Sequence, residues 1–207
     1  MRILIVDDHA VVRRGLRQIL ADEFPGAEFA EAQNAGEALA LAAGEKWDCI
    51  VLDITLPGRN GLEVLRELGA HGSKVPVLVL SAHPEDQYAL RVLKAGAAGY
   101  MTKDHAPEEL VKAVKKVIAG GKYITGALAE KLADQLRRDT SRAPHELLSD
   151  REFQVLRMIA ASRAIKEIAA ELSLSEKTVS TYHTRLLEKM NMRSDADLVR
   201  YAIEHGL

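Results

Sequence analysis

The stretch Cys49–Gly61, "CIVLDITLPGRNG", places Asp53 at the end of a short apolar run and follows it with a proline and two glycines. A carboxylate at the tip of a buried strand is unfavourable unless it caps a helix, reaches solvent or takes part in chemistry. Similar apolar runs alternate with helical patterns up to about residue 121. They cover 3–6, 28–32, 49–52, 77–81 and 98–101. This alternation predicts a doubly wound α/β fold, a five-stranded parallel sheet with helices on both faces.

The composition fits a globular protein without a membrane partner. Of the 207 residues, 47% are hydrophobic and 28% are charged, which suits one or two domains with a substantial core. The single cysteine lies in an apolar run, and no apolar stretch reaches the roughly 18 residues of a membrane span. We therefore expect a cytoplasmic protein. A net charge of −2 leaves nucleic acid open as a partner, because a basic patch can be local.

Polar side chains follow the predicted strands at the edge where parallel strands end. Because ligands bind at the carboxyl ends of parallel strands, these side chains share one candidate site. Three carboxylates close together repel one another unless a cation lies among them, so the cluster predicts a bound divalent metal. Oxygen ligands on an open rim favour Mg²⁺. The side chains are those of Asp7, Asp8, Asp53, Ser81 and Lys103.

With a metal present, Asp53 has a chemical role. Its carboxylate can attack phosphorus and form an aspartyl-phosphate, while Lys103 neutralises phosphoryl oxygens and Ser81 donates a hydrogen bond. Each residue alone has a simpler interpretation as a cap or a solvated loop residue. Asp7 and Asp8 could merely complement the dipole of the following helix. The joint arrangement at several strand ends favours a phosphoryl acceptor.

Four motifs resemble the receiver domain of bacterial two-component response regulators, which has a flavodoxin-like fold. They are "ILIVDDH" (3–9), "IVLDITLPGRNG" (50–61), "VLVLSAH" (77–83) and "AGAAGYMTKD" (95–104). The resemblance implies a receiver over residues 1–122 that a sensor histidine kinase phosphorylates on Asp53.

The same resemblance implies roles for individual residues. Ser81 and Lys103 would bind the phosphoryl group, and Ser81 and Tyr100 would form the switch. The metal ligands would be Asp7, Asp8, Asp53 and the backbone carbonyl of Thr55. One departure is Asp104, where a proline often follows the lysine. We interpret His9 and His83, which lie near the site, as solvated loop histidines.

From Gly126 onward every periodic segment is helical, which predicts a second domain of a different class. We expect a linker with a helix over 123–146 and a four-helix domain over 147–207, with capping boxes at Ser149–Glu152 and Ser194–Asp197. Segment 165–190 has the layout of a helix-turn-helix. Val179, Tyr182, Leu186 and Met190 form a stripe that should face the core.

The outward face of the second helix of this motif is polar and basic, which favours contact with double-stranded DNA. A polar face that simply meets water is the alternative. The candidate DNA-binding residues are Lys177, Ser180, Thr181, Thr184, Arg185 and Lys189.

The motif at 148–190 resembles the LuxR-type DNA-binding domain of the NarL/FixJ class of response regulators, and the resemblance covers about 147–207. The resemblance implies a homodimer when active, paired through the last helix, where we expect an exposed apolar edge of Leu198, Tyr201 and Ala202. The whole chain is thus expected to be a response regulator in which phosphorylation controls dimerisation and sequence-specific DNA binding, and not a turnover enzyme.

Two other classes of protein fit the sequence less well. A phosphatase of the haloacid dehalogenase type also uses an aspartate nucleophile on a parallel sheet, but it needs a second acid where this chain has Thr55. A DNA-binding protein whose receiver serves only for docking would need an incomplete acidic site, and this one is complete.

Overall fold

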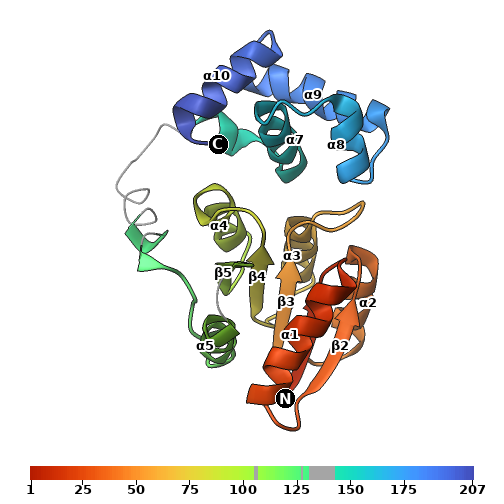
Figure 1. Cartoon of the computed structure of the whole chain (residues 1–207), viewed down its shortest axis with the longest axis vertical. Helices are drawn as coiled ribbons and strands as arrows, with labels where there is room; N and C mark the ends of the chain where they lie inside the picture. Colours follow the sequence, from red (N-terminus) through yellow and green to blue (C-terminus); the bar gives the residue numbers. More distant parts are fainter. Residues whose placement is uncertain (105–106, 127, 131–142) are drawn as a thin grey trace. The chain divides into compact units, whose positions relative to one another are not determined.

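The chain forms two compact units, Met1–Arg137 and Arg138–Leu207. The computed structural model describes residues 1–104, 107–126, 128–130 and 143–207 (Figure 1). The first unit alternates strands and helices and the second is helical, as the sequence patterns predict. The domain limits at 122 and 147 stay predictions.

The first unit contains a parallel sheet of five strands in the order β2-β1-β3-β4-β5. Its continuous apolar runs suit strands that are buried on both faces. The order changes direction between β1 and β3, and in such sheets ligands bind outside the carboxyl ends of the strands at this point. The predicted flavodoxin-like fold is confirmed. The strands are β1 (Arg2–Val6), β2 (Glu28–Ala32), β3 (Cys49–Asp53), β4 (Val77–Ser81) and β5 (Gly99–Thr102).

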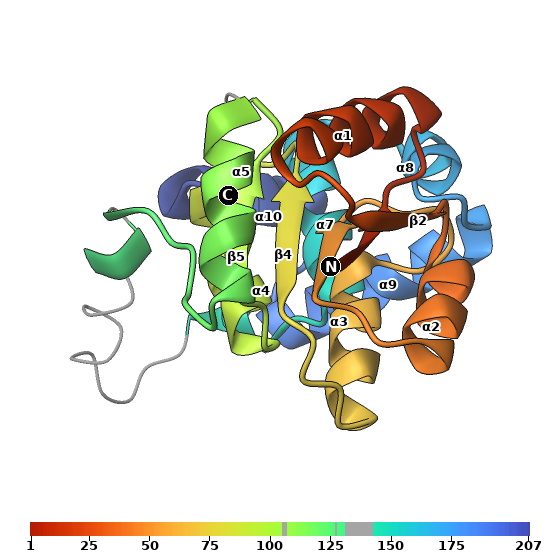
Figure 2. The same ribbon diagram turned by 90° about the horizontal axis from the view of Figure 1, so that it is seen from below.

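Helices cover both faces of the sheet (Figure 2). α1 (Ala10–Glu23) and α5 (Pro107–Ile118) pack on one face, and α2 (Ala35–Gly44), α3 (Gly61–Ala70) and α4 (Glu85–Lys94) lie on the other. Right-handed crossovers between neighbouring parallel strands produce this double winding.

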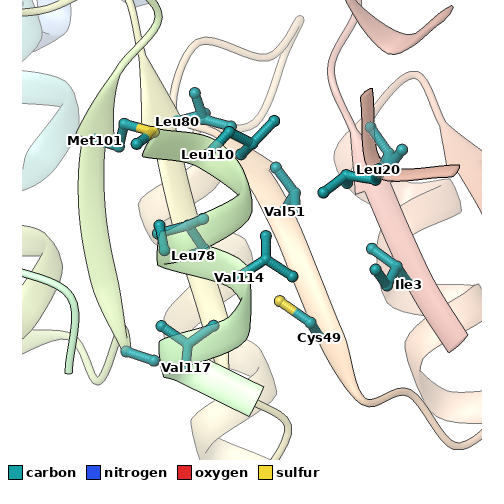
Figure 3. Close-up of a cluster of buried hydrophobic side chains, with 13 residues drawn as sticks. Ile3, Leu20, Cys49, Val51, Leu78, Leu80, Met101, Leu110, Val114 and Val117 are labelled. Atoms are coloured by element: carbon teal, nitrogen blue, oxygen red, sulfur yellow. The ribbon is translucent and has the colours of Figure 1, made fainter. Parts of the chain in front are cut away.

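The core beneath α5 shows why this helix packs where it does. Leu110, Val114 and Val117 recur at helical spacing and point onto the sheet (Figure 3). Burying each such side chain stabilises the fold by about 1.5–3 kcal/mol. Cys49 lies in the same cluster, and burial raises the pKa of its thiol to about 12. Cys49 therefore packs as a small hydrophobic residue, as predicted.

The segment after α5 closes the edge of the sheet beside β5. Tyr123 forms an isolated parallel bridge with Gly99, and its N–H donates to the Ala98 carbonyl at 2.9 Å. A Cβ at Gly99 would lie 2.8 Å from the Tyr123 carbonyl oxygen, so the close approach needs glycine. Gly126 and residues 128–130 are helical, whereas most of the linker predicted to contain a helix, 123–146, lies outside the described residues.

The second unit confirms the predicted helices and adds a short one. η1 (Pro144–Leu147) is a 3-10 helix within the segment predicted as linker, where Pro144 suits a first helical turn. It is followed by α7 (Asp150–Ala160), α8 (Ile165–Glu171), α9 (Glu176–Met190) and α10 (Asp195–His205).

Side-chain caps begin three of these four helices. The capping box of Ser149 and Glu152 is present in full. Ser194 also caps its helix, but the Asp197 carboxylate accepts from the Arg193 N–H instead of completing a capping box.

Between α8 and α9 the chain turns at Ser173, whose φ of 54° is left-handed. Ser175 then accepts from the Thr178 N–H and starts α9.

Candidate functional site

The predicted polar side chains lie at the carboxyl ends of the strands. Asp7 directly follows β1, Asp53 and Ser81 end β3 and β4, and Lys103 directly follows β5. Asp7, Asp53 and Ser81 are almost completely buried, with at most 3% of their surface exposed. The Lys103 backbone N–H donates to the Ser81 carbonyl at 2.8 Å, which continues the pairing of β4 with β5 beyond the last strand residue.

Lys103 joins the two buried carboxylates. Its ammonium nitrogen Nζ lies 2.6 Å from Asp7 Oδ2 and 2.7 Å from Asp53 Oδ2. The other oxygen of each carboxylate accepts a backbone N–H, from His9 at 2.8 Å and from Thr55 at 3.1 Å. Both carboxylates are thus fixed in orientation, as a positioned nucleophile requires.

The charges of the site are not balanced by protein groups alone. Burial raises the pKa of Asp53 to about 6, although Lys103 acts in the opposite direction. Burial lowers the pKa of Lys103, but the two carboxylates outweigh it, so its pKa lies above the ordinary value and the amine stays charged. Two carboxylates thus share one ammonium, and the exposed Asp8 adds a third negative charge nearby.

This donor set fits a divalent cation. Asp7, Asp8 and His9 offer ligand atoms that lie within 4.8 Å of one another. His9 Nδ1 lies 2.8 Å from Asp8 Oδ1, so the imidazole contacts the acidic cluster more closely than the sequence indicates. Carboxylate oxygens on a partly open rim suit Mg²⁺.

The loop after Asp53 folds back tightly over the backbone of this residue. The Gly61 N–H donates to the Ile54 carbonyl at 2.9 Å, and a Cβ on Gly61 would lie 2.2 Å from the Asp53 carbonyl oxygen. Asn60 caps α3 by accepting from the Leu62 N–H at 2.8 Å. The glycine is needed here because no side chain fits between the loop and the strand end.

Ser81 and Tyr100 are connected through the backbone of His83. Ser81 Oγ accepts from the His83 N–H at 3.1 Å, and the buried Tyr100 hydroxyl donates to the His83 carbonyl at 2.7 Å. A movement of the Ser81 side chain therefore acts on the same peptide units that hold Tyr100.

His83 is not the solvated loop histidine that we predicted. Its ring stacks on Tyr88 at a centroid distance of 4.8 Å, and its Nε2 lies 3.4 Å from Thr55 Oγ1. The prediction was wrong because nothing in the local sequence indicates that α4 brings Tyr88 back over this loop. The peptide bond between Lys103 and Asp104, where a proline is frequent, is trans.

In the second unit, α9 presents the predicted polar face. Val179, Leu186 and Met190 are buried and Tyr182 is half-buried, so the predicted core stripe is confirmed. A shallow hollow of about 260 Å³ is lined by Lys177, Thr178, Thr181, Tyr182 and Arg185. The six candidate DNA-binding residues are all exposed: Lys177, Ser180, Thr181, Thr184, Arg185 and Lys189.

Lys189 differs from the other cations of α9 because it has a buried partner. Its Nζ lies 2.7 Å from Glu152 Oε2 on α7, and the Glu152 side chain is nearly buried. Burial raises the pKa of the Glu152 carboxyl, but hydrogen bonds from Lys189 and Ser149 outweigh it, so the pKa lies below its ordinary value. Lys189 thus ties α9 to α7.

The prediction of an exposed apolar edge on the last helix was wrong. Leu198, Tyr201 and Ala202 are 0%, 9% and 1% exposed, because their spacing of three and four residues places them on the face of α10 that packs in the domain core. The large apolar side chain that α10 exposes is that of Ile203, with 75% of its surface accessible.

The described part of the chain has no helix with the length and apolar character that a membrane crossing requires. A buried aspartate beside a lysine at the rim of a doubly wound sheet, followed in the same chain by a helix-turn-helix, defines a regulator controlled by phosphorylation. Residues 3–115 match the response regulator receiver domain, and residues 146–202 match the bacterial regulatory proteins of the luxR family. The chain belongs to the response regulators that join these two domains.

Relatives of known class support this assignment over the full length. The chain is 36% identical to the response regulator UvrY of Escherichia coli, over 100% of this chain and 95% of the relative. It is 38% identical to the response regulator GacA of Pseudomonas aeruginosa, over 100% of this chain and 97% of the relative. The family is one of regulators, not turnover enzymes, which excludes the phosphatase alternative.

Solved structures agree with the fold. A LuxR-family response regulator from an Aurantimonas species shares 36% identity with a TM-score of 0.59, over 66% of this chain and 98% of that one. RcsB from Salmonella enterica serovar Typhimurium gives a TM-score of 0.65 at 23% identity, over 97% of each chain, a likeness of fold alone.

Proposed function

We propose that Asp53 is the phosphorylated residue of this response regulator and that its phosphorylation controls DNA binding by residues 147–207. The observation that carries the proposal is the contact of Lys103 with both Asp53 and Asp7 at the sheet rim. It gives one buried carboxylate a fixed orientation and places a permanent cation where phosphoryl charge would develop.

The chemistry is a phosphoryl transfer from a phosphohistidine of a sensor histidine kinase. A carboxylate oxygen of Asp53 bonds to phosphorus as the bond from phosphorus to the imidazole nitrogen breaks, and that nitrogen takes up a proton. Lys103 stays protonated and neutralises one phosphoryl oxygen. The Ser81 hydroxyl donates a hydrogen bond to another.

Asp7, Asp8, Asp53 and the backbone carbonyl of Thr55 are the residues that would hold Mg²⁺. The deficit of positive charge among the carboxylates supports this assignment. When bound, the ion neutralises phosphoryl oxygens that Lys103 alone cannot reach. Asp7 has a second role, because its contact with Lys103 holds the ammonium beside Asp53.

We assign the switch to Ser81 and Tyr100. When the Ser81 hydroxyl turns toward a phosphoryl group, it gives up its bond from the His83 N–H, and the His83 carbonyl that holds Tyr100 moves with it. Phosphorylation adds nearly two negative charges, so it has a large differential interaction with the two arrangements.

On the DNA side, we assign base and phosphate contacts to the exposed face of α9. Lys177 and Arg185 line one hollow, and their positive charges suit it to a backbone phosphate. Lys189 is also exposed, but its ion pair with Glu152 leaves it a smaller share of any phosphate contact. We further propose that the active form is a cytoplasmic homodimer, since two domains on a two-fold site double the few cationic contacts of one.

Phosphorylation of the purified chain tests the assignment of the acceptor. Incubation with acetyl phosphate and Mg²⁺ should add one phosphoryl mass to the wild type and none to Asp53→Ala. Asp22→Ala, which removes an exposed carboxylate of α1, is the matched control and should be phosphorylated like the wild type. Equal labelling of Asp53→Ala would show that another residue is the acceptor.

A further inference from the structure

Two threonines occupy the middle of the exposed face of α9, between a charged residue at each end of the same line. Lys177, Thr181, Thr184 and Glu188 follow one another at steps of four, three and four residues, so they share one line along the helix. This line lies opposite the buried stripe of Val179, Leu186 and Met190. Because a helix enters a groove with the face opposite its own core, the two threonines occupy the deepest part of any DNA contact.

Both threonine hydroxyls donate to the backbone of their own helix. Thr181 Oγ1 donates to the Lys177 carbonyl at 2.9 Å, and Thr184 Oγ1 donates to the Ser180 carbonyl at 3.1 Å. This bond uses the only hydroxyl proton that each side chain has. Each threonine can therefore offer DNA a methyl group and an acceptor lone pair, but no hydrogen-bond donor.

We infer that Thr181 and Thr184 determine sequence specificity by placing their methyl groups against thymine C5-methyl groups in the major groove. The inference rests on the proposed DNA-binding function, and it specifies the thymine methyl group as the feature of the DNA that α9 recognises. Thymine is the base that carries a methyl group in this groove, whereas guanine offers two acceptors that call for donors the threonines lack. Adenine, which pairs with thymine, carries an amino group that can donate a hydrogen bond to the threonine oxygens.

We assign the phosphate contacts to the cationic residues of the same helix. Lys177 and Arg185 line the same hollow as Thr181 and Tyr182. Their two positive charges favour contact with a phosphate oxygen. Phosphate contacts fix the register of the helix on the duplex without reading the sequence. The threonines then meet base edges at defined positions.

Deoxyuridine provides the test, because it differs from thymidine only by the missing methyl group. The full-length protein, phosphorylated with acetyl phosphate and Mg²⁺, is first used to select its preferred duplexes from a randomised pool. Each thymine of the selected site is then replaced in turn by uracil. We expect the affinity of the wild type to fall about fourfold at the positions under Thr181 and Thr184, the factor that follows from one buried methyl-sized group.

Variants at Thr184 separate the methyl group from the hydroxyl. Thr184→Val keeps a methyl group and should still discriminate thymine from uracil, whereas Thr184→Ser loses it and should bind both duplexes equally. Lys177→Gln is the matched control, because losing a phosphate contact weakens binding to both duplexes by the same factor. Thermal unfolding of each variant should match the wild type, since the changes lie on an exposed face.

The outcomes distinguish the inference from the proposed function. If specific sites are selected but uracil replaces every thymine without loss, or Thr184→Ser discriminates as well as the wild type, the threonines do not read thymine although the protein binds DNA. If the phosphorylated protein selects no sequence at all, the proposed DNA-binding function fails, and the inference fails with it.

Discussion

Gly61 connects local backbone geometry to the chemistry of Asp53. An added Cβ would lie 2.2 Å from the Asp53 carbonyl oxygen and 2.9 Å from Ile54 Cα, and backbone atoms cannot give way as a flexible side chain can. Gly61→Ala should therefore lower the free energy of unfolding by about 2–3 kcal/mol in denaturant titrations. Acetyl phosphate should also label this variant more slowly, because the strand end must shift.

A second glycine gives the control for this prediction. Gly15 lies inside α1 with no atom within 4 Å of an added Cβ, so Gly15→Ala should stabilise the protein by about 0.5–1 kcal/mol. If Gly61→Ala is as stable as the wild type, the loop does not lie in close contact with the Asp53 backbone.

Asp8→Ala is the substitution that best tests the proposed Mg²⁺ site. Asp8 is exposed and contacts the neighbouring His9, so Asp8→Ala should fold normally. Millimolar Mg²⁺ should raise the melting temperature of the wild type, because a ligand that binds only the folded state stabilises it. The variant should show a much smaller rise, and Asp22→Ala the same rise as the wild type. An equal rise in Asp8→Ala would exclude this carboxylate as a ligand.

The sequence correctly predicts the position of a site residue where the topology of the sheet alone determines that position. Asp7, Asp53, Ser81 and Lys103 had to meet at one rim because parallel strands end there, whatever their side chains do. His83 could not be placed in this way, because its surroundings depend on how α4 returns Tyr88 to the loop. Contacts made by packing between elements are not encoded in the spacing of residues along one of them.

At the scale of elements, the same limit applies to α10. The spacing of Leu198, Tyr201 and Ala202 predicts correctly that the three share a face of the helix. It does not say whether that face meets the core of its own domain or a second chain. The structure places them in the core, since α10 packs on α7, and leaves Ile203 outside.

The ion pair of Lys189 and Glu152 joins α9 to α7 and should contribute measurably to the free energy of unfolding. Lys189→Met leaves the nearly buried Glu152 without its cation, and because Lys189 is itself partly exposed we expect a loss of about 1 kcal/mol near neutral pH. The pKa of Glu152 in the folded protein lies below its ordinary value of 4.5, so the stabilisation is present above that pH and is lost as the pH falls through the folded-state pKa.

Denaturant titrations at several pH values check this prediction. The stabilities of wild type and Lys189→Met should differ near neutral pH and converge in acid. Arg185→Met is the control on the same helix: it should keep the wild-type stability but weaken DNA binding. A constant difference at all pH values would mean that Lys189 stabilises the domain without acting through the Glu152 charge.

At the scale of the whole molecule, the prediction concerns how two copies assemble. If the active form is a homodimer paired through α10, Ile203 is the large apolar side chain that this helix can offer, with 75% of its surface exposed. Ile203→Glu should prevent the mass doubling of the phosphorylated protein in light scattering, because two buried carboxylates would face each other across a two-fold axis. Binding to a two-half-site duplex should weaken about tenfold or more, while binding to one half-site and the melting temperature stay unchanged.

Val11→Glu is the matched control, because Val11 is an apolar residue of α1 with 82% of its surface exposed, and this variant should dimerise normally. Dimerisation of Ile203→Glu at the wild-type concentration would place the pairing surface elsewhere, on the receiver or on another face of the DNA-binding domain.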